Sequence, residues 1–381
     1  MDFNHTEEQN LIRETVREFA EKEIKPVAKE LDEKAEFSYE LTSRMGELGL
    51  FGMNISPDYG GQGMDTLSYI IAVEEIARID GSHAATLAAH NSLGIGPIYY
   101  YGTEEQKKEI LPKLCTGQGL WAFGLTEPNA GSDSRGTKTS AELKEGNWVI
   151  NGSKIFITNG ATEITLGATV QAVTGVVDGK KEYSTIIVAQ ETEGFKAIEM
   201  HGKMMWRASN TAELFFDNCT VPEENLLGER GHGSRIMLHT LDNGRLSIAA
   251  MGLGCAQGAY EAALEYAKQR EQFGRPITKF QAISFKLADM ATKIELARNL
   301  LYKACWLKDN DKPFAKEAAM SKLYCSEIAK EVADAAVQIH GGYGLMKEFD
   351  VERFYRDQRL LQIGEGTSEI QRLVISRYIG C

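Results

Sequence analysis

Apolar residues in the first third of the chain recur at the spacing of one helix face. This pattern follows Thr6 and Gln9, which have the spacing of a capping box, and continues to about Leu31. A second capping box, Thr103 with Gln106, precedes another apolar repeat. The pattern predicts helices over residues 7–31, 39–48, 67–79, 84–99 and 104–114.

The periodicity changes near Leu120, where short alternating runs rich in β-branched residues begin. Two segments between these runs, Glu145-Gly146-Asn147 and Asp178-Gly179-Lys180, are typical of hairpin turns. The middle of the chain therefore predicts an antiparallel β domain, with strands over residues 137–143, 148–150, 155–158, 169–174, 184–189, 195–198 and 211–216.

Helical spacing returns after Gly233 and persists almost to the end of the chain. The long Ala-rich segments 234–270, 280–309, 315–339 and 349–358 are separated by short breaks, which indicates an antiparallel bundle. Because the order is helices, strands and helices again, a parallel Rossmann sheet is disfavoured. We predict a multidomain α+β protein with an N-terminal helical domain (1–121), a middle antiparallel β domain (122–232) and a C-terminal four-helix bundle (233–381).

Composition and charge exclude several classes of partner. The chain has 381 residues and a net charge of −12 without a basic run, so neither nucleic acid nor an anionic membrane is an expected partner. Its six cysteines form no CxxC pair, which predicts reduced thiols and no metal centre. No apolar run reaches the ~18 residues of a membrane helix, and Met1–Asn4 shows no secretory pattern. We expect a cytoplasmic protein, with the mitochondrial matrix as the alternative.

Four segments could each contribute to a ligand site, and each also has an ordinary structural explanation. Residues 252–258 carry three glycines inside a helical pattern at the wrong spacing for a dinucleotide loop, which favours close helix packing. Residues 270–276 place two arginines at a helix break, as a pyrophosphate site or a solvated loop would. Residues 338–342 fit either a ligand contact or a glycine C-cap. Residues 123–133 run from a strand into a polar turn that fits a ligand loop or an ordinary hairpin.

One carboxylate near the end of the chain lies between two glycines. Gly364 and Gly366 permit a sharp turn that would project Glu365 into a cavity rather than along a helix face. Such a carboxylate could act as a base. The alternative is a loop followed by a helix, with Ser368 as the N-cap residue.

Five segments in register resemble one family. They are Leu125-Thr126-Glu127-Pro128-x-Ala130-Gly131-Ser132-Asp133, Leu241-Asp242-x-Gly244-Arg245, Arg270-x-x-Phe273-Gly274, Gln338-x-x-Gly341-Gly342 and Glu365-Gly366-Thr367-Ser368-Glu369-Ile370-Gln371-Arg372. Together they resemble the acyl-CoA dehydrogenases over the whole chain, most of all the short-chain (butyryl-CoA) branch. The resemblance implies the same three-part fold, a homotetramer, and FAD bound between the β domain and the bundle.

The resemblance also implies a role for each matching residue. The mouth for flavin and substrate would be lined by Phe123, Leu125, Thr126 and Ser132, and the flavin ring would be flanked by Phe156, Ile157 and Thr158. The FAD of a neighbouring subunit would be reached by Arg270, Phe273, Gln281, Gln338, Gly341 and Gly342. Thr367 and Glu369 would hold the pyrophosphate and adenosine side. The acyl-CoA would be contacted by Ser132, Asp242 and Arg245, with Gly366 beside the thioester.

The resemblance makes Glu365 the catalytic base of an α,β-dehydrogenation. The α-proton of a thioester is a weak acid, so a base must lie in contact with it. Flavin N5 would accept the hydride from the β-carbon. The family stabilises the thioester oxygen with the N–H of this glutamate and a ribityl hydroxyl. A dry pocket is expected to raise the pKa of Glu365 toward neutrality.

Some positions depart from the family pattern. Other branches carry the base at the position of Gly244, which has no side chain here and so favours Glu365. Phe156 stands where the family usually has Trp, and Trp206 stands where an aliphatic residue is typical. Residues 82–90 contain no Arg, which disfavours a glutaryl-CoA enzyme. Asn91 replaces the aspartate of a diene-forming branch, so ordinary α,β-dehydrogenation is expected.

The predicted function is thus FAD-dependent dehydrogenation of a short-chain acyl-CoA, with electron-transferring flavoprotein as the electron acceptor. A dehydrogenase of branched or alicyclic acyl-CoA is the alternative within the same class. An acyl-CoA oxidase and a non-catalytic acyl-CoA-binding scaffold are alternatives of other classes. No metal is expected.

Overall fold

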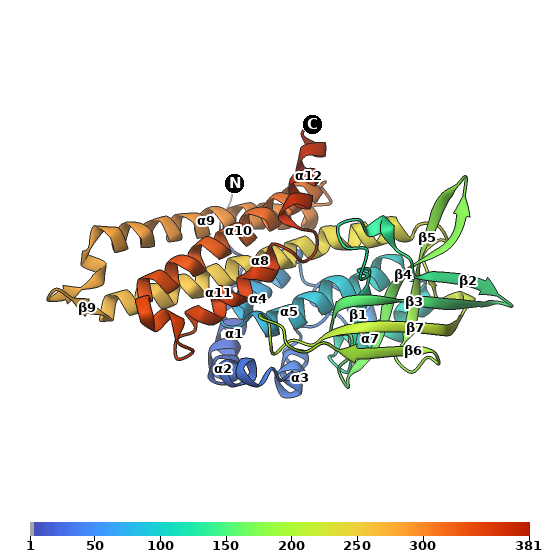
Figure 1. Cartoon of the computed structure of the whole chain (residues 1–381), viewed down its shortest axis with the longest axis horizontal. Helices are drawn as coiled ribbons and strands as arrows, with labels where there is room; N and C mark the ends of the chain where they lie inside the picture. The colour runs from blue at the N-terminus through green and yellow to red at the C-terminus, as the bar shows by residue number, and fades with distance from the viewer. Residues whose placement is uncertain (1–3) are drawn as a thin grey trace.

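The computed structural model describes residues 4–381. A mixed β-sheet occupies one end of an elongated molecule, and long helices from both ends of the chain extend away from it (Figure 1). The predicted α+β class and its order of helices, strands and helices are confirmed. Residues 1–3, which carry most of the segment tested for a secretory pattern, lie outside the described residues.

The N-terminal region is helical, as predicted. The capping box of Thr6 and Gln9 is present at the start of the first helix, and that of Thr103 and Gln106 begins α7. The predicted helix over residues 84–99 is interrupted by a π-helical segment, His90–Ile95. The helices are α1 (Glu7–Phe19), α2 (Lys25–Lys34), α3 (Tyr39–Glu47), α4 (Thr66–Ala77), α5 (Gly81–Ala89), α6 (Gly96–Tyr101) and α7 (Glu104–Cys115), with a further π segment, Ala20–Ile24, between α1 and α2.

The middle region forms one eight-stranded sheet in the order β6-β7-β3-β2-β4-β5-β8, with β1 paired to β4. Its strands are β1 (Leu120–Gly124), β2 (Ser140–Lys144), β3 (Asn147–Thr158), β4 (Thr165–Val177), β5 (Lys180–Ala189), β6 (Phe195–Glu199), β7 (Thr211–Pro222) and β8 (Leu226–Leu227). Neighbours pair antiparallel except that β1 runs parallel to β4 and β2 makes one parallel bridge to β4. The sheet is therefore mixed rather than purely antiparallel, because β1 enters from the helical region instead of through a hairpin.

The two predicted hairpin turns are confirmed. Glu145 and Gly146 join β2 to β3 with φ values of 50° and 77°. Asp178 and Gly179 join β4 to β5 with φ values of 51° and 73°. Positive φ at both central residues twists a two-residue turn in the sense of the flanking strands, which explains the choice of residues.

The C-terminal region contains three long helices and two short ones, α8 (Gly233–Gln269), α9 (Gln281–Asp309), α10 (Ala315–His340), α11 (Val351–Leu361) and α12 (Ser368–Tyr378). The first four pack together as the predicted bundle, and α12 packs against α10. The glycines of segment 252–258 serve helix packing as expected. A Cβ at Gly254 would lie 2.3 Å from Glu74 O, and one at Gly258 would lie 2.0 Å from Arg78 O.

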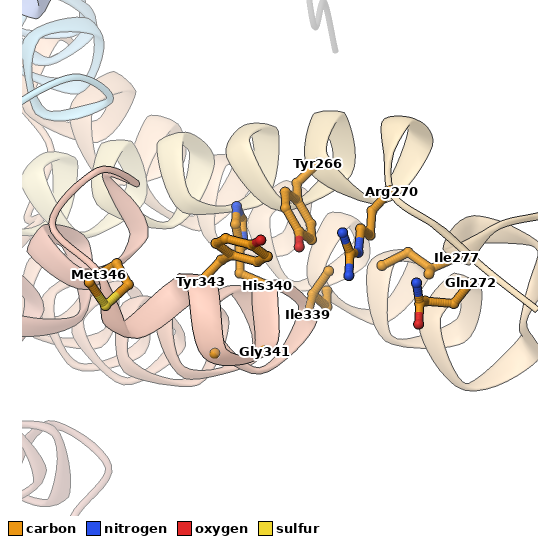
Figure 2. A pocket seen from close by; sticks show the side chains of 10 residues that line it. Tyr266, Arg270, Gln272, Ile277, Ile339, His340, Gly341, Tyr343 and Met346 are labelled. Atoms are coloured by element: carbon orange, nitrogen blue, oxygen red, sulfur yellow. The ribbon is translucent and has the colours of Figure 1, made fainter.

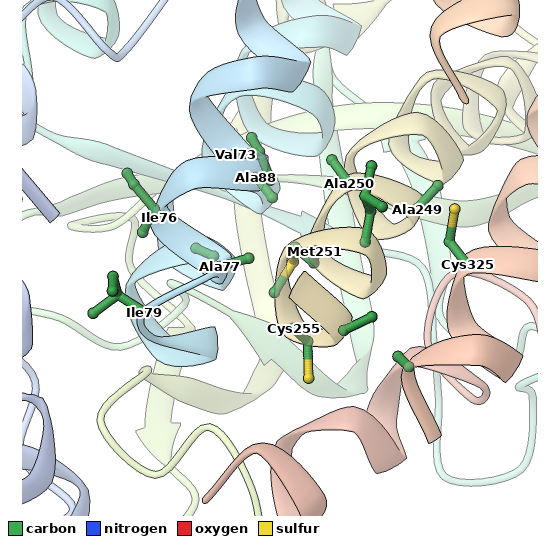
Figure 3. Close-up of a cluster of buried hydrophobic side chains, with 14 of the residues drawn as sticks. Val73, Ile76, Ala77, Ile79, Ala88, Ala249, Ala250, Met251, Cys255 and Cys325 are labelled. Carbon is green, nitrogen blue, oxygen red and sulfur yellow. The ribbon is translucent and has the colours of Figure 1, made fainter. Parts of the chain in front are cut away.

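The N-terminal and C-terminal helices share one hydrophobic core, the sheet has its own, and a third cluster joins N-terminal helices to the sheet and to the start of α8. Figure 3 shows Ala77 of α4 beside Met251 of α8. Because α4 and α5 pack directly on α8, the N-terminal and C-terminal helices form one layer. The sheet packs against this layer through β4 and β5, which contact α8. The boundaries 1–121, 122–232 and 233–381 remain predictions.

Two general properties concern the whole of residues 4–381. No helix in this range combines the length and the hydropathy needed to cross a membrane. The same residues contain no group of three or more His, Cys, Asp or Glu side chains arranged to hold a metal ion. The cytoplasmic location stays a prediction.

Candidate active site

A cavity of about 420 Å³ lies where the sheet meets helices α5 and α8 and the loop between α11 and α12. Eleven of the residues predicted for the site line it, namely Phe123, Leu125, Thr126, Ser132, Phe156, Ile157, Thr158, Arg245, Glu365, Gly366 and Thr367. These residues come from four separate parts of the chain. The fold therefore brings together the positions that were predicted for catalysis, for the flavin side and for the thioester side.

The loop that carries Glu365 is held in a left-handed conformation. Glu365 has φ 52° and Gly366 has φ 92°, a region that costs energy for any residue with a side chain. The side chain of Gln371 donates hydrogen bonds to the carbonyls of Glu365 (3.2 Å) and Gly366 (3.0 Å), which fixes the turn. Thr367, not Ser368, is the N-cap residue of α12, since its hydroxyl accepts from the N–H of Ile370. The interpretation of Ser368 as N-cap is wrong by one residue, because the turn ends at Thr367 and Ser368 is already the first residue of the helix.

The Glu365 carboxylate lines the cavity, and one of its two oxygens has no hydrogen-bond donor among residues 4–381. Its Oε2 atom is buried and accepts no hydrogen bond from any group of residues 4–381. Burial raises the pKa of Glu365 to about 7, while the positive charges of Lys322 and Arg245 oppose the rise. A buried oxygen without a donor, on a carboxyl that titrates near neutrality, is suited to accepting a proton.

Gly244 of α8 leaves the space that this carboxylate occupies. A Cβ at Gly244 would lie 2.0 Å from Glu365 Oε2 and 3.0 Å from Leu93 Cδ2. The absence of a side chain at this position is therefore a steric requirement of the Glu365 conformation, as well as a sign that the base is not supplied from α8.

The sheet presents a flat aromatic side chain to the same cavity. A register irregularity between Lys154 and Ile157 interrupts the pairing of β3 with β7, and Phe156 has φ 61° within it. A bulge of this kind redirects a side chain out of the sheet. Phe156 is 64% exposed although it lines a pocket, which leaves one face of its ring open to a planar group.

The loop after β1 is anchored by a buried ion pair. Lys154 of β3 contacts Glu127 at 2.8 Å and donates to the carbonyl of Leu125 at 3.2 Å. Glu127 also accepts from the backbone N–H groups of Lys138 and Thr139. Segment 123–133 therefore contains a tight turn between Glu127 and Ala130 that is tied to β3, and this holds Leu125 and Thr126 at the cavity wall.

Arg245 and Asp242 form a pair on α8. The Arg245 side chain is 5% exposed, contacts the Asp242 carboxylate and lines the cavity. Burial raises the pKa of Asp242, and the neighbouring Arg245 charge lowers it. Asp242 is not among the lining residues, so here it orients Arg245.

A second pocket of about 470 Å³ lies far from Glu365, beside the β9–β10 hairpin (Glu271–Gln272 and Arg275–Pro276) at the other end of α8 (Figures 1 and 2). Arg270 lies 5.6 Å from the Tyr343 ring centroid, and Tyr266 stacks on His340 at 4.2 Å. Three predicted residues, Arg270, Gly341 and Gly342, line this pocket. Phe273 is 93% exposed at the tip of the hairpin.

The predicted site is thus divided in two. The group assigned to the FAD of a neighbouring subunit lies away from the Glu365 cavity of its own chain. Five predicted residues line neither pocket: Asp242, Phe273, Gln281, Gln338 and Glu369. Their predicted roles stay predictions.

Sequence reasoning missed most of the apolar wall of the cavity. That wall includes Ala85, Ala88 and Ala89 on one face of α5, and Leu238, Leu241, Ile248 and Met251 on one face of α8. The spacing of these residues is helical, but it is the same spacing that core residues have. Only the packing of the two helices against the sheet distinguishes a cavity wall from a core.

Trp206 is another lining residue, and a buried carboxylate fixes it. Its backbone N–H donates to Asp357 Oδ1 at 2.8 Å, and a Cβ at Gly81 would lie 2.8 Å from the indole Nε1. Burial, with the nearby Asp80 charge, raises the pKa of Asp357 to about 7. The pKa of Asp80 is lowered despite its burial, by hydrogen bonding to His83 and by charge. Asp80 is therefore the more acidic of the two, and Asp357 is the one that takes up a proton first as the pH falls.

Replacing Asp357 with Asn is expected to stabilise the protein at alkaline pH. The folded protein binds this proton more tightly than the unfolded chain does, so the free energy of unfolding falls as pH rises from about 4 to 7. Each unit of pKa shift corresponds to about 1.4 kcal/mol. The Asn side chain keeps an oxygen that can accept the hydrogen bond from the Trp206 backbone N–H. It loses the electrostatic attraction between the Asp357 carboxylate and the Arg353 guanidinium. We expect a net gain of about 1 kcal/mol or more at pH 8.

Urea denaturation of both proteins at pH 5.5 and pH 8 measures this difference. The gain should be larger at pH 8 than at pH 5.5. An equal effect at the two pH values would mean that Asp357 does not change its protonation in this range.

Three family models match consecutive parts of the chain. They are the acyl-CoA dehydrogenase N-terminal domain over residues 6–118, the middle domain over 122–219 and the C-terminal domain over 231–380. The chain belongs to the acyl-CoA dehydrogenase family. The predicted family, the oxidoreductase class and FAD as the cofactor are thereby confirmed.

Individual acyl-CoA dehydrogenases and solved structures resemble the chain over its whole length. A short-chain specific acyl-CoA dehydrogenase of Clostridium acetobutylicum is 47% identical over 376 residues, 99% of each chain. The solved butyryl-CoA dehydrogenase of Megasphaera elsdenii is 45% identical with a TM-score of 0.96, covering 100% of both chains. A chain in a structure of the electron transferring flavoprotein of Acidaminococcus fermentans is 46% identical with a TM-score of 0.97, also covering 100% of both.

The residues around the cavity fit the flavin of an acyl-CoA dehydrogenase. An open aromatic face at Phe156, a rigid polar loop at Thr126 and an unsatisfied carboxylate at Glu365 surround a largely apolar space. A planar redox group against Phe156 would share this space with the Glu365 carboxylate. This arrangement of a redox group and a base across one substrate is what removal of two vicinal hydrogens requires.

Proposed function

We propose that this acyl-CoA dehydrogenase oxidises a short-chain acyl-CoA to the 2-enoyl-CoA, with Glu365 as the base for the α-proton. The observation that carries the proposal is the buried, unsatisfied Oε2 of Glu365 inside a cavity that fits flavin. The short-chain preference is supported by the names of the relatives from Clostridium and Megasphaera. FAD, when bound, supplies the acceptor for the β-hydride.

Glu365 performs the proton transfer in this proposal. Its carboxylate must be ionised before it can accept the α-proton, and a pKa near 7 makes both forms accessible at neutral pH. The left-handed turn at Glu365 and Gly366 aims the side chain, and Gln371 keeps the turn from relaxing. After the transfer, the neutral carboxylic acid is the form that burial favours.

The backbone of the same residue is available to the thioester oxygen. In the described part of the chain, the Glu365 N–H donates no hydrogen bond to a carbonyl or side chain. A free N–H beside the base can stabilise the negative charge that develops on the thioester oxygen as the α-proton leaves. One residue would then supply both the base and a donor of the oxyanion hole.

The far pocket supports a neighbouring subunit as part of the holoenzyme. Arg270 and the glycines 341 and 342 line a groove without a carboxylate, and Phe273 of the adjacent hairpin has almost its whole surface exposed. An Arg fork suits a pyrophosphate. We infer that this end of the chain completes the FAD site of another copy, within a homotetramer.

Electron-transferring flavoprotein is the proposed partner that reoxidises the enzyme. The support is the resemblance of the whole chain to a chain in the Acidaminococcus structure of that flavoprotein. Reoxidation of the substrate-reduced enzyme should accordingly be fast with electron-transferring flavoprotein and slow with O₂. Fast reaction with O₂ while product is bound would instead favour the oxidase.

Anaerobic titration of the purified holoenzyme with linear, branched and alicyclic acyl-CoAs tests the substrate proposal. Butyryl-CoA is expected to bleach the flavin faster than branched, cyclic or long-chain thioesters do. Faster bleaching by a branched or alicyclic thioester would replace the short-chain assignment. A protein that binds acyl-CoA but carries no flavin would be the non-catalytic scaffold.

A further inference from the structure

A buried lysine reaches the loop of Glu365 from the neighbouring helix. Lys322 lies in α10, has 0% of its surface exposed, and its Nζ donates to the carbonyl of Gly366 at 2.6 Å. That carbonyl belongs to the residue directly after the proposed base. Burying an ammonium group is costly unless its charge is compensated.

The hydrogen bond alone does not explain a charged residue at this position. The Gly366 carbonyl already accepts from Gln371 at 3.0 Å, so it would be satisfied without Lys322. A whole buried ion pair is often no more stable than apolar side chains of the same volume, so a buried charge is weak evidence for a stabilising role. The positive charge of Lys322 therefore needs a function other than closing this hydrogen bond.

The charges around Lys322 identify that function. Burial lowers the pKa of Lys322 to about 8. The carboxylates of Glu365 and Glu369 oppose this shift, whereas the positive charge of Arg245 adds to it. Reciprocally, Lys322 is the largest influence that lowers the pKa of Glu365, followed by Arg245. Tyr69 also faces Glu365, with its own pKa well above neutrality because of burial. Lys322 is thus the main compensating charge for the buried carboxylate.

We propose that Lys322 is a positioning residue for Glu365, which fixes the Gly366 backbone through a hydrogen bond and keeps the carboxylate ionised through its charge. This proposal rests on the proposed role of Glu365 as the base. Without Lys322, burial would keep Glu365 protonated at neutral pH and remove the base before substrate arrives. With Lys322, the ionised carboxylate stays accessible near neutral pH and is still basic enough to take the α-proton.

Three substitutions separate the charge from the hydrogen bond. Lys322→Met removes both, Lys322→Gln keeps a donor without the charge, and Lys322→Arg keeps the charge. Loss of a nearby opposite charge shifts a buried carboxyl by about one pH unit or more. We expect the acidic limb of the kcat/KM–pH profile to move up by about that amount in the Met and Gln variants. Arg should restore the original limb at least in part.

Lys308→Met is the matched control. Lys308 is a largely enclosed lysine that lies over the rings of Tyr100 and Phe314 and lowers the pKa of neither Glu365 nor Lys322. This control loses a partly buried ammonium and should lose stability, with the acidic limb of the profile unmoved. If Lys322→Met does not fold, the Gln variant carries the test.

Infrared difference spectra across pH give a readout that needs no turnover. The band of the protonated Glu365 carboxyl, identified by its absence from Glu365→Gln, should persist to higher pH in Lys322→Met and Lys322→Gln. Superimposable profiles and bands in wild type, Lys322→Met and Lys322→Gln would overturn the proposal. Full activity of Glu365→Gln would instead overturn the proposed function, so the two failures are distinguishable.

Discussion

Glu365→Gln is expected to retain FAD and acyl-CoA binding while kcat falls by roughly 10²-fold or more, the usual contribution of a general base. Gln has nearly the same shape, so the cavity and the turn at Gly366 should persist. The amide cannot accept the α-proton, and Oε2, which has no donor among residues 4–381, is where the reaction needs a free lone pair. Rapid-reaction reduction of the flavin under anaerobic conditions measures the chemical step directly.

The pH dependence of the wild-type enzyme should report the same carboxyl. Only the ionised form accepts a proton, so kcat/KM should rise with pH through a midpoint near the pKa of about 7. The small residual rate of Glu365→Gln should lack this limb. Turnover by this variant close to the wild-type value, or an unchanged acidic limb in it, would reject Glu365 as the base.

Gly244→Ala should inactivate the enzyme without weakening its fold. The added Cβ would lie 2.0 Å from Glu365 Oε2, and the end of that flexible side chain is the part most easily displaced. Misplacing a catalytic group by about 1 Å can cost roughly 10²-fold in rate. Ala in place of Gly inside a helix stabilises it by about 1 kcal/mol, so activity and stability should change in opposite directions. Steady-state kinetics and thermal unfolding measure the two effects.

Gly96→Ala is a suitable control for this substitution. It also adds a methyl group to a helical glycine, but the nearest atom to its Cβ, Asn91 O, lies 3.8 Å away, an ordinary contact. Its rate should stay close to that of the wild type. A Gly244→Ala enzyme with the wild-type rate would show that Glu365 does not need the conformation seen here.

The pattern of apolar residues predicted the secondary structure well, because helix periodicity and capping residues are set by neighbouring positions. The helices α8, α9 and α10 begin and end within one or two residues of segments 234–270, 280–309 and 315–339. The errors arose where tertiary contacts decide. The π segment at His90–Ile95 interrupts a continuous helical pattern, and the parallel pairing of β1 with β4 joins segments that no turn connects.

The site shows the same division between local and distant information. Glu365 could be found because two flanking glycines mark an unusual turn in the sequence itself. Lys322 could not, since it lies 44 residues before Gly366 and looks like any other charged residue of a long helix. The sequence likewise gave no sign that Asp357 holds Trp206 across 151 residues.

By itself, the sequence determined the α+β architecture and the family, and it singled out Glu365 as the candidate base, because periodicity, turn residues and short motifs are properties of neighbouring positions. Only the tertiary structure decided the protonation and the aim of that carboxylate. Both depend on burial against α8, on the charge of Lys322 and on the space left by Gly244, and these are properties of residues that folding brings together.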